Sequence, residues 1–215
     1  MKTTVKFCGL TQAESVALVP AGGIAGFVID VPESPRNLTI DRVAALIDNV
    51  PTEAEAWAVV VDPPADVIHR LFDEAGVDRI QVYGAVPADL EFLEVHHVVP
   101  SLPIPPPGSD APDPPIPPAE DYSRLHLDAA GGPLPGGSGI RSDWTRCARI
   151  IDTQPGRKFL LAGGLNAENV AQALAEVRPW GVDVSSGVES SPGVKDPARM
   201  NAFLAAIERY ESQHG

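Results

Sequence analysis

The sequence predicts a single parallel (β/α)₈ barrel domain over residues 1–215. Short β-branched apolar runs recur eight times, and amphipathic segments separate most of them. Several runs stand next to a Gly, Pro, Ser or Asp, where turns begin. Eight strand–helix units in 215 residues match the lower end of the size range of this fold. A doubly wound open sheet is the competing architecture, but it leaves the eighth unit poorly explained.

The candidate strands are four to six residues long and mostly apolar, as buried parallel strands are. They are Thr4–Phe7, Ile24–Ile29, Ala58–Val61, Arg79–Tyr83, Val95–Val99, Arg124–Leu127, Lys158–Leu161 and Gly181–Val184. The fifth strand carries His96 and His97, whose side chains would face opposite ways and make a poor metal pair. The sequence therefore predicts no zinc or iron site.

Helical patterns lie between most of these strands. Asp41–Val50 carries apolar residues at i, i+3, i+4 and i+7, and Asn166–Val177 begins with a capping Asn. Asp196 is expected to cap a helix whose first residue is Pro197, a position that suits proline. Weaker helix candidates are Pro64–Ala75 and Arg141–Thr153.

Two segments interrupt the alternation. Pro100–Pro118 holds ten prolines in nineteen residues, so an irregular or polyproline-II segment should replace the helix after the fifth strand. A ligand for a proline-recognising domain is the less favoured alternative. Gly131–Gly139 holds five glycines and two prolines after the sixth strand, at the active face of a barrel. It is expected to be a loop that could close over a substrate.

The composition narrows the class of partner and the compartment. A formal net charge of −13 argues against a nucleic-acid backbone or an anionic membrane as partner. No apolar run approaches the roughly 20 residues that a membrane helix needs. Two cysteines make no disulfide framework and the N-terminus lacks a leader pattern, so a cytoplasmic protein is expected. The 12 Arg against 4 Lys and the excess of carboxylates fit either adaptation to high salt or a GC-rich genome.

In a barrel of this kind, functional side chains lie at the carboxyl ends of the strands. The polar residues at those ends are the candidates for binding and catalysis. They are Lys6, Cys8, Ser34, Arg36, Gln81, Tyr83, Asp128, Asp183, Ser185 and Ser186.

Two glycine-containing turns predict a phosphate site. Gly163-Gly164 follows the seventh strand and Ser186-Gly187 the eighth, the two loops that usually bind phosphate in this fold. Glycines let backbone N–H groups approach an anion, and a helix N-terminus adds positive potential. Either turn alone would be weak evidence, because glycine is also the usual residue of tight turns.

Cys8 and Asp128 are the candidate pair for proton transfer. A thiolate can act as a base if its pKa is lowered, for which Lys6 is a candidate, and an aspartic acid can act as a donor. Cys8 is otherwise a small buried hydrophobe, and Asp128 a helix or turn cap. Arg36, after Ser34-Pro35, could hold a carboxylate bidentately or remain a solvated loop residue.

Six blocks occur in the order found in one enzyme family. They are Lys6–Thr11; Gly26–Val28 with Ser34–Arg36; Leu127-Asp128 with Gly136–Gly139 and Asp143-Trp144; Leu161–Asn166 with Glu168–Val170; Gly181–Glu189; and Gly193–Asp196. Together they resemble the phosphoribosylanthranilate isomerases of tryptophan biosynthesis, across essentially the whole chain. The resemblance implies a (β/α)₈ barrel that isomerises N-(5'-phosphoribosyl)anthranilate by an Amadori rearrangement, with no metal or cofactor.

The resemblance also implies a role for each site residue. Asp128 would protonate the ribose ring oxygen, and Cys8 would remove the proton from the carbon that carries the 2'-hydroxyl. Arg36 would hold the anthranilate carboxylate, with Asp183 near the amine or supporting the site. Backbone near Gly164 and Gly187 would hold the phosphate. The expected ligand is thus a phosphorylated small molecule, and the family includes monomers and dimers, which leaves the oligomeric state open.

The sequence departs from the family pattern at three places, and each concerns the shape of the pocket. Tyr83 follows Gln81-Val82 where the family usually has His, and Ser142 precedes Asp143-Trp144 where it usually has Phe. The spacing from Gly26 to Arg36 is one residue long against common bacterial members. The alternatives are a dual-substrate aminoaldose isomerase of the tryptophan and histidine pathways, or an inactive phosphate-binding barrel that serves as a partner protein. Cys8 argues against the first, and Cys8 with Asp128 against the second.

Overall fold

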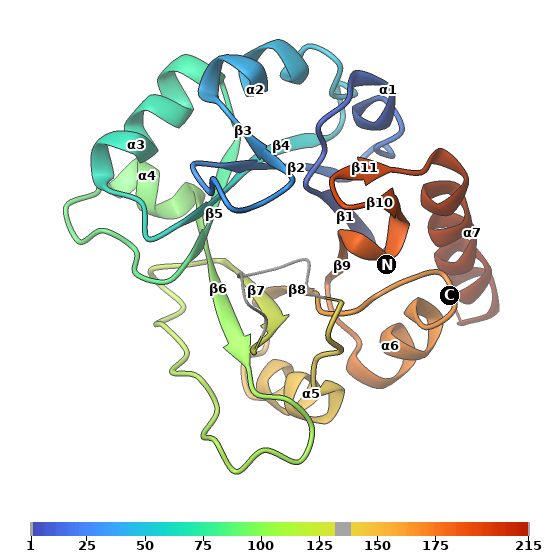
Figure 1. The fold of residues 1–215 in the computed structure, drawn as a ribbon. Coiled ribbons are helices and arrows are strands. Elements are labelled where there is room, and N and C mark those ends of the chain that lie inside the picture. Colours follow the sequence, from blue (N-terminus) through green and yellow to red (C-terminus); the bar gives the residue numbers. More distant parts are fainter. Residues whose placement is uncertain (1, 132–138, 215) are drawn as a thin grey trace.

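The computed structural model describes residues 2–131 and 139–214, and within them eight parallel strands close into a barrel (Figure 1). They are β1 (Thr4–Cys8), β2 (Ile24–Ile29), β4 (Glu55–Val61), β5 (Arg79–Tyr83), β6 (Val98–Ile104), β7 (Arg124–Ala129), β8 (Lys158–Leu161) and β9 (Gly181–Val184). The first strand pairs with both β2 and β9, which excludes the open sheet. A short strand, β3 (Asn37–Leu38), adds to the end of β2.

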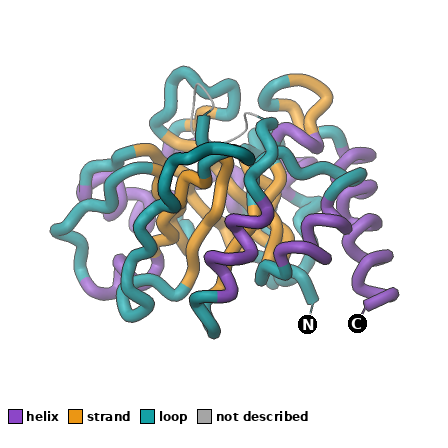
Figure 2. The backbone as a smooth tube through the Cα atoms, turned by 90° about the horizontal axis from the view of Figure 1, so that it is seen from below, coloured by secondary structure: helices purple, strands orange, loops and turns teal. Residues whose placement is uncertain are grey.

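Helices surround the barrel (Figures 1 and 2). They are α1 (Ala13–Val16), α2 (Ile40–Ile47), α3 (Ala65–Arg70) with a π-helical turn over Leu71–Ala75, α4 (Phe92–His97), α5 (Trp144–Asp152), α6 (Val170–Val177) and α7 (Pro197–His214). Each of the five predicted helical segments overlaps a helix, although α2 begins one residue before the predicted Asp41 and ends three residues before Val50. No helix in the described part of the chain is long and apolar enough to cross a membrane.

Side-chain hydrogen bonds to backbone N–H groups occur at the starts of two helices, α7 and α6. Asp196 caps α7 as predicted, because its Oδ1 accepts the backbone N–H groups of Ala198 and Arg199. The helix α6 begins four residues after the predicted cap, Asn166, and its own N-cap is Asn169. Asn166 Oδ1 still accepts the backbone N–H groups of Glu168 and Asn169, as a capping side chain does, in the turn that leads into the helix.

The predicted fifth strand, Val95–Val99, was placed too early. Phe92–His97 forms α4, so His96 and His97 lie on a helix and not on a strand. Glu91 and Glu94 form a capping box that satisfies backbone N–H groups at its start. The strand follows as Val98–Ile104, through Pro100 and Pro103. Proline usually ends a strand, because it cannot donate to the ladder, and sequence reasoning therefore stopped too soon.

The remainder of the proline-rich segment, residues 105–118, contains no helix or strand. Side chains of α5 and of the loop after it hold this segment. Arg146 donates to the backbone oxygen of Ala111 and to the Asp113 carboxylate, and Arg149 also contacts Asp113. Arg157 donates to the carbonyl of Pro117 at 2.7 Å. Charged donors thus satisfy backbone carbonyls that have no helix to pair with.

At the amino ends of the barrel strands, ion pairs and aromatic contacts join neighbouring strands. Glu55, at the start of β4, accepts hydrogen bonds from Arg79, Arg124 and the indole of Trp57. The Arg124 guanidinium lies over the ring of Trp180, 4.9 Å from its centroid. These contacts join the starts of β4, β5 and β7 and the residue before β9. They lie at the opposite end of the barrel from the carboxyl ends of the strands.

Candidate active site

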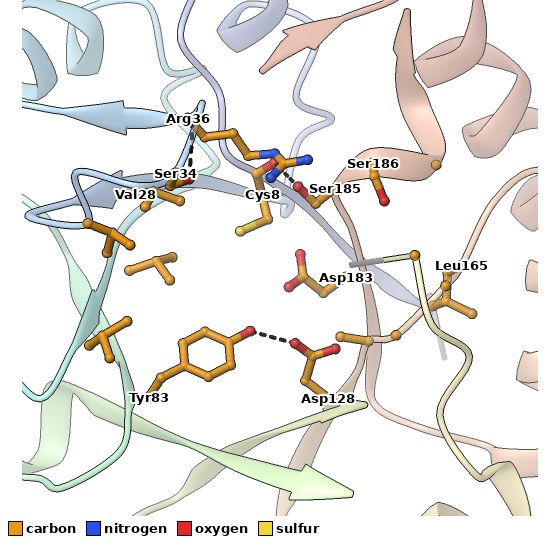
Figure 3. Close-up of a pocket in the computed structure, with 18 residues that line it drawn as sticks. Cys8, Val28, Ser34, Arg36, Tyr83, Asp128, Leu165, Asp183, Ser185 and Ser186 are labelled. Atoms are coloured by element: carbon orange, nitrogen blue, oxygen red, sulfur yellow. Dashed lines mark hydrogen bonds between the residues drawn. The ribbon is translucent and has the colours of Figure 1, made fainter. Parts of the chain in front are cut away.

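A cavity lies at the carboxyl ends of the barrel strands (Figure 3). Its lining side chains include Cys8 from β1, Tyr83 from β5, Asp128 from β7 and Asp183 from β9. Because these strands come from different parts of the barrel, polar groups face the cavity from several sides.

Cys8 is the last residue of β1, and its thiol points into the cavity (Figure 3). Burial raises the pKa of this thiol, and the nearby Asp183 carboxylate adds to the rise. Lys6 and Lys195 act in the opposite direction without outweighing burial. Lys6 lowers the pKa of Cys8 as expected, but not enough to bring it below its usual value.

Asp128 approaches the cavity from the side opposite Cys8 (Figure 3). Its Oδ2 accepts a hydrogen bond from the hydroxyl of Tyr83 at 2.8 Å, and its Oδ1 accepts the backbone N–H of Ala129 at 2.9 Å. The Tyr83 ring packs edge-on against His126, with 5.9 Å between ring centroids. Burial, and then the Asp128 carboxylate, raise the pKa of Tyr83 well above its usual value, so its hydroxyl stays protonated.

Asp183 stands on a fully buried polar network. Its Oδ2 lies 3.0 Å from Lys6 Nζ and 2.9 Å from His126 Nε2. The other ring nitrogen of His126 lies 3.2 Å from both Gln81 Nε2 and Ser101 Oγ. Burial disfavours the charged form of Asp183, but Lys6 and His126 outweigh it and its pKa is lowered. Asp183 Oδ1 has no hydrogen-bond partner among the described residues.

Lys6 and Gln81, which were predicted to contact substrate, lie behind the residues that line the cavity. Both side chains are fully buried, and neither belongs to the lining. Lys6 is the register partner of Asp183 on the neighbouring strand and contacts its carboxylate, and Gln81 contacts His126. Their position makes them supports for Asp183 and His126.

Arg36 lines the cavity but is already paired. Its Nε and Nη2 donate to the two carboxylate oxygens of Glu189, each at 2.8 Å. Lys195 donates to the same carboxylate at 2.7 Å and to the carbonyl of Ser185 at 3.1 Å. Burial opposes ionisation of Glu189, but the two cations outweigh it and its pKa is lowered. Two cations share one carboxylate here, so the cluster keeps a net positive charge beside the cavity.

The two predicted phosphate turns come together at the rim. Gly163, Gly164, Ser186 and Gly187 all line the cavity. Gly164 has a φ of +63°, and a Cβ there would lie 2.9 Å from the backbone oxygen of Gly139. At Gly187 a Cβ would lie 2.0 Å from the backbone oxygen of Leu165. Gly187 therefore stands where the loops after β8 and β9 pack closely, and Gly164 where the loop after β8 packs on residues 139–141 after β7.

Most of the predicted site residues line one cavity: Cys8, Arg36, Asp128, Asp183, Gly163, Gly164, Ser186 and Gly187. Residues 132–138 of the predicted Gly131–Gly139 loop lie outside the described residues. Sequence reasoning gave no role to Glu189 or Lys195, although both stand in the motif blocks, and it missed His126. Among the described side chains, no group of three or more His, Cys, Asp or Glu residues could hold a metal ion.

Comparisons with known proteins agree on one family. Residues 5–206 match the family model of N-(5'phosphoribosyl)anthranilate (PRA) isomerase. N-(5'-phosphoribosyl)anthranilate isomerase of Chelativorans sp. is 36% identical over 96% of this chain and 96% of its own. The enzyme of the same name from Azorhizobium caulinodans is 37% identical over 99% of this chain and 94% of its own.

Solved structures give the same result. Phosphoribosyl anthranilate isomerase from Thermotoga maritima superposes with a TM-score of 0.78 and 26% identity, covering 96% of this chain and 99% of its own. A phosphoribosyl anthranilate isomerase in complex with reduced 1-(o-carboxyphenylamino)-1-deoxyribulose 5-phosphate has a TM-score of 0.74 and 25% identity, at the same coverage.

Proposed function

The chain belongs to the N-(5'-phosphoribosyl)anthranilate isomerase family, and from that premise we propose how its own residues perform the reaction. The enzyme acts in tryptophan biosynthesis and converts an aminoaldose, N-(5'-phosphoribosyl)anthranilate, into an aminoketose, 1-(2-carboxyphenylamino)-1-deoxyribulose 5-phosphate. This conversion moves hydrogens within one molecule. It therefore needs a proton donor and a proton acceptor on either side of the sugar.

The observation that carries the assignment is that Cys8 and Asp128 face one cavity from opposite sides (Figure 3). Asp128 gives a proton to the ribose ring oxygen while the bond from that oxygen to C1' breaks. The amine lone pair forms the C1'=N bond of a Schiff base. The Cys8 thiolate then takes the proton from C2'. The electrons of that C–H bond form a C1'=C2' double bond, and the C1'=N π electrons return to the nitrogen, which gives an enol amine. Proton transfer from the enol hydroxyl to C1' yields the ketone, and the proton on Cys8 returns to Asp128 before the next turnover.

The remaining residues of the cavity hold the two anionic ends of the substrate. The Nη1 group of Arg36, which its two bonds to Glu189 do not use, meets the anthranilate carboxylate. Backbone N–H groups near Gly164 and Gly187 bind the phosphate. Asp183 Oδ1, which has no partner within the described chain, accepts from the substrate amine. Binding at both ends positions the reacting carbons between the donor and the acceptor.

Three proposals concern the setting of this site. Residues 1–215 act as one barrel domain, in which the segment 105–118 takes the place of the outer helix between β6 and β7. Its attachment by Arg146 and Arg157, together with the packing of Ile116 against the core, supports that arrangement. The protein works in the cytoplasm on a phosphorylated small molecule.

The test is the loss of substrate fluorescence, with N-(5'-phosphoribosyl)anthranilate generated in place from anthranilate and phosphoribosyl pyrophosphate. The wild type should consume it faster than it decays. Cys8→Ala and Asp128→Asn should each lower kcat by about 10²–10⁴-fold, as expected for general acid–base groups. Cys147→Ala is the matched control, since Cys147 is buried in α5 and does not line the cavity. Wild-type turnover in either site variant would refute that residue's role.

A further inference from the structure

We propose that Tyr83 is the positioning residue for the proton donor: its hydroxyl holds Asp128 Oδ2 and supports the carboxylate that forms when Asp128 gives up its proton. The inference rests on the proposed role of Asp128 and adds a residue to it. In the sequence, Tyr83 is a departure from the family pattern that concerns the shape of the pocket. The structure instead brings its hydroxyl to the reacting carboxyl group.

The contact between the two side chains is set by the barrel itself. Tyr83 ends β5, and its carbonyl accepts the backbone N–H of Asp62 at 2.9 Å. Gly84 follows with a φ of +83°, and a Cβ there would lie 2.1 Å from Asp62 Oδ1, so the turn after Tyr83 is tightly packed. The ring is seated against His126. Both the backbone and the ring of Tyr83 are therefore fixed, and its hydroxyl has little freedom to leave Asp128.

The two donors on Asp128 fix the direction of its carboxyl group. The Tyr83 hydroxyl reaches Oδ2 at 2.8 Å, and the Ala129 N–H reaches Oδ1 at 2.9 Å. One hydrogen bond on each oxygen holds the plane of the group against rotation. A carboxyl group has further lone pairs for a proton and for the substrate, so these bonds leave it able to react.

The same hydrogen bond strengthens during the reaction. Burial and Asp128 keep the phenol of Tyr83 neutral, so it remains a donor throughout the working pH range. When Asp128 passes its proton to the ribose oxygen, negative charge develops on the carboxylate beside this donor. Hydrogen bonds to charged groups are stronger than those to neutral groups. Tyr83 thus stabilises the state after proton transfer more than the state before it, which raises kcat and leaves substrate binding alone.

Tyr83→Phe tests the proposal, since it removes the hydroxyl and keeps the ring that packs on His126. We expect kcat to fall about 10- to 100-fold, the range for a hydrogen bond to a charged group, with KM within about threefold of wild type. Tyr210→Phe is the control, because Tyr210 lies on α7 against His214 and outside the cavity. Circular dichroism and thermal melting check that each variant is folded.

A double-mutant cycle separates positioning from a merely structural role. In an Asp128→Asn background, Tyr83→Phe should lower kcat by less than about twofold more, because the group it serves is gone. The proposal is overturned by wild-type kcat in Tyr83→Phe, by an equal loss in both backgrounds, or by a rise confined to KM. If instead Asp128→Asn alone keeps full activity, the assignment of the acid fails, and this result differs from all three.

Discussion

Gly187 is the point where the two loops proposed to bind phosphate meet, so Gly187→Ala perturbs that site with a single methyl group. The added Cβ would lie 2.0 Å from the backbone oxygen of Leu165 and 3.2 Å from Asn166 Cβ. Real Cβ contacts essentially never fall below 3.0 Å, and the first of these atoms belongs to backbone that cannot swing aside. The loops after β8 and β9 must therefore part by about 1 Å.

A displacement of that size has a known scale of effect. Misplacing a substrate by about 1 Å costs on the order of 10²-fold in rate, because the reacting atoms leave the near-attack geometry. We expect Gly187→Ala to lower kcat/KM by about 100-fold. Inorganic phosphate, used as a competitive inhibitor, should bind more weakly by a similar factor.

Steady-state fluorescence assays with and without phosphate measure both quantities. Gly156→Ala is the matched control: Gly156 has a φ of +88° and nothing within 4 Å of its Cβ position, so alanine there strains the backbone and touches no loop. It should lower Tm slightly and leave kcat/KM unchanged. A folded Gly187→Ala enzyme with kcat/KM within about twofold of wild type would refute the reasoning.

Three further predictions follow from charge and hydrogen bonding. Because burial raises the pKa of Cys8 and the proposed base is its thiolate, the residual kcat/KM of Asp128→Asn, in which the proposed acid no longer titrates, should rise with pH from about 7 to 9, and a flat pH profile in that variant would contradict this role. Asp183 and Glu189 have lowered pKa values, so the stability they contribute is present above about pH 4.5 and is lost as pH falls through the folded values. Urea unfolding should show that loss, with a shallower acid limb in Glu189→Gln. Arg146→Ala should lower stability by about 1–2 kcal/mol without changing kcat. The more exposed Arg149→Ala should cost less, and equal melting temperatures for the two would contradict the attachment of the proline-rich segment.

The barrel and most of its site followed from the sequence because they depend on local signals. A buried parallel strand needs a run of apolar residues, and a close approach of loops needs glycine, so both features are visible in the order of residues. Position at a strand end then predicts which side chains share a face. Cys8, Asp128 and Gly187 were found in this way, and the structure brings all three to one cavity.

Two features could not be predicted from the sequence: how deep a side chain lies in the barrel, and which residues far apart in the sequence contact each other. Lys6 and Cys8 are two positions apart on one strand, yet only Cys8 reaches the cavity. Alternation along a strand predicts that both side chains face the same side of the sheet. It does not predict how far each lies from the cavity. Glu189 pairs with Arg36 across 153 positions of sequence, a separation at which no local pattern predicts contact.

The buried ion pairs explain how an acidic chain can bind a substrate with two anionic ends. A net charge of −13 would repel such a ligand if the negative charges were distributed evenly over the protein, the cavity included. Two carboxylates beside the cavity are instead paired with cations: Asp183 with Lys6, and Glu189 with both Arg36 and Lys195. Asp128 accepts only the neutral donors of Tyr83 and Ala129, as a proton donor can. The pairing of Glu189 with two cations places positive charge beside the proposed carboxylate site. Because buried charges are screened less than exposed ones, that charge acts on the carboxylate end of the substrate more strongly than surface carboxylates beyond a Debye length do.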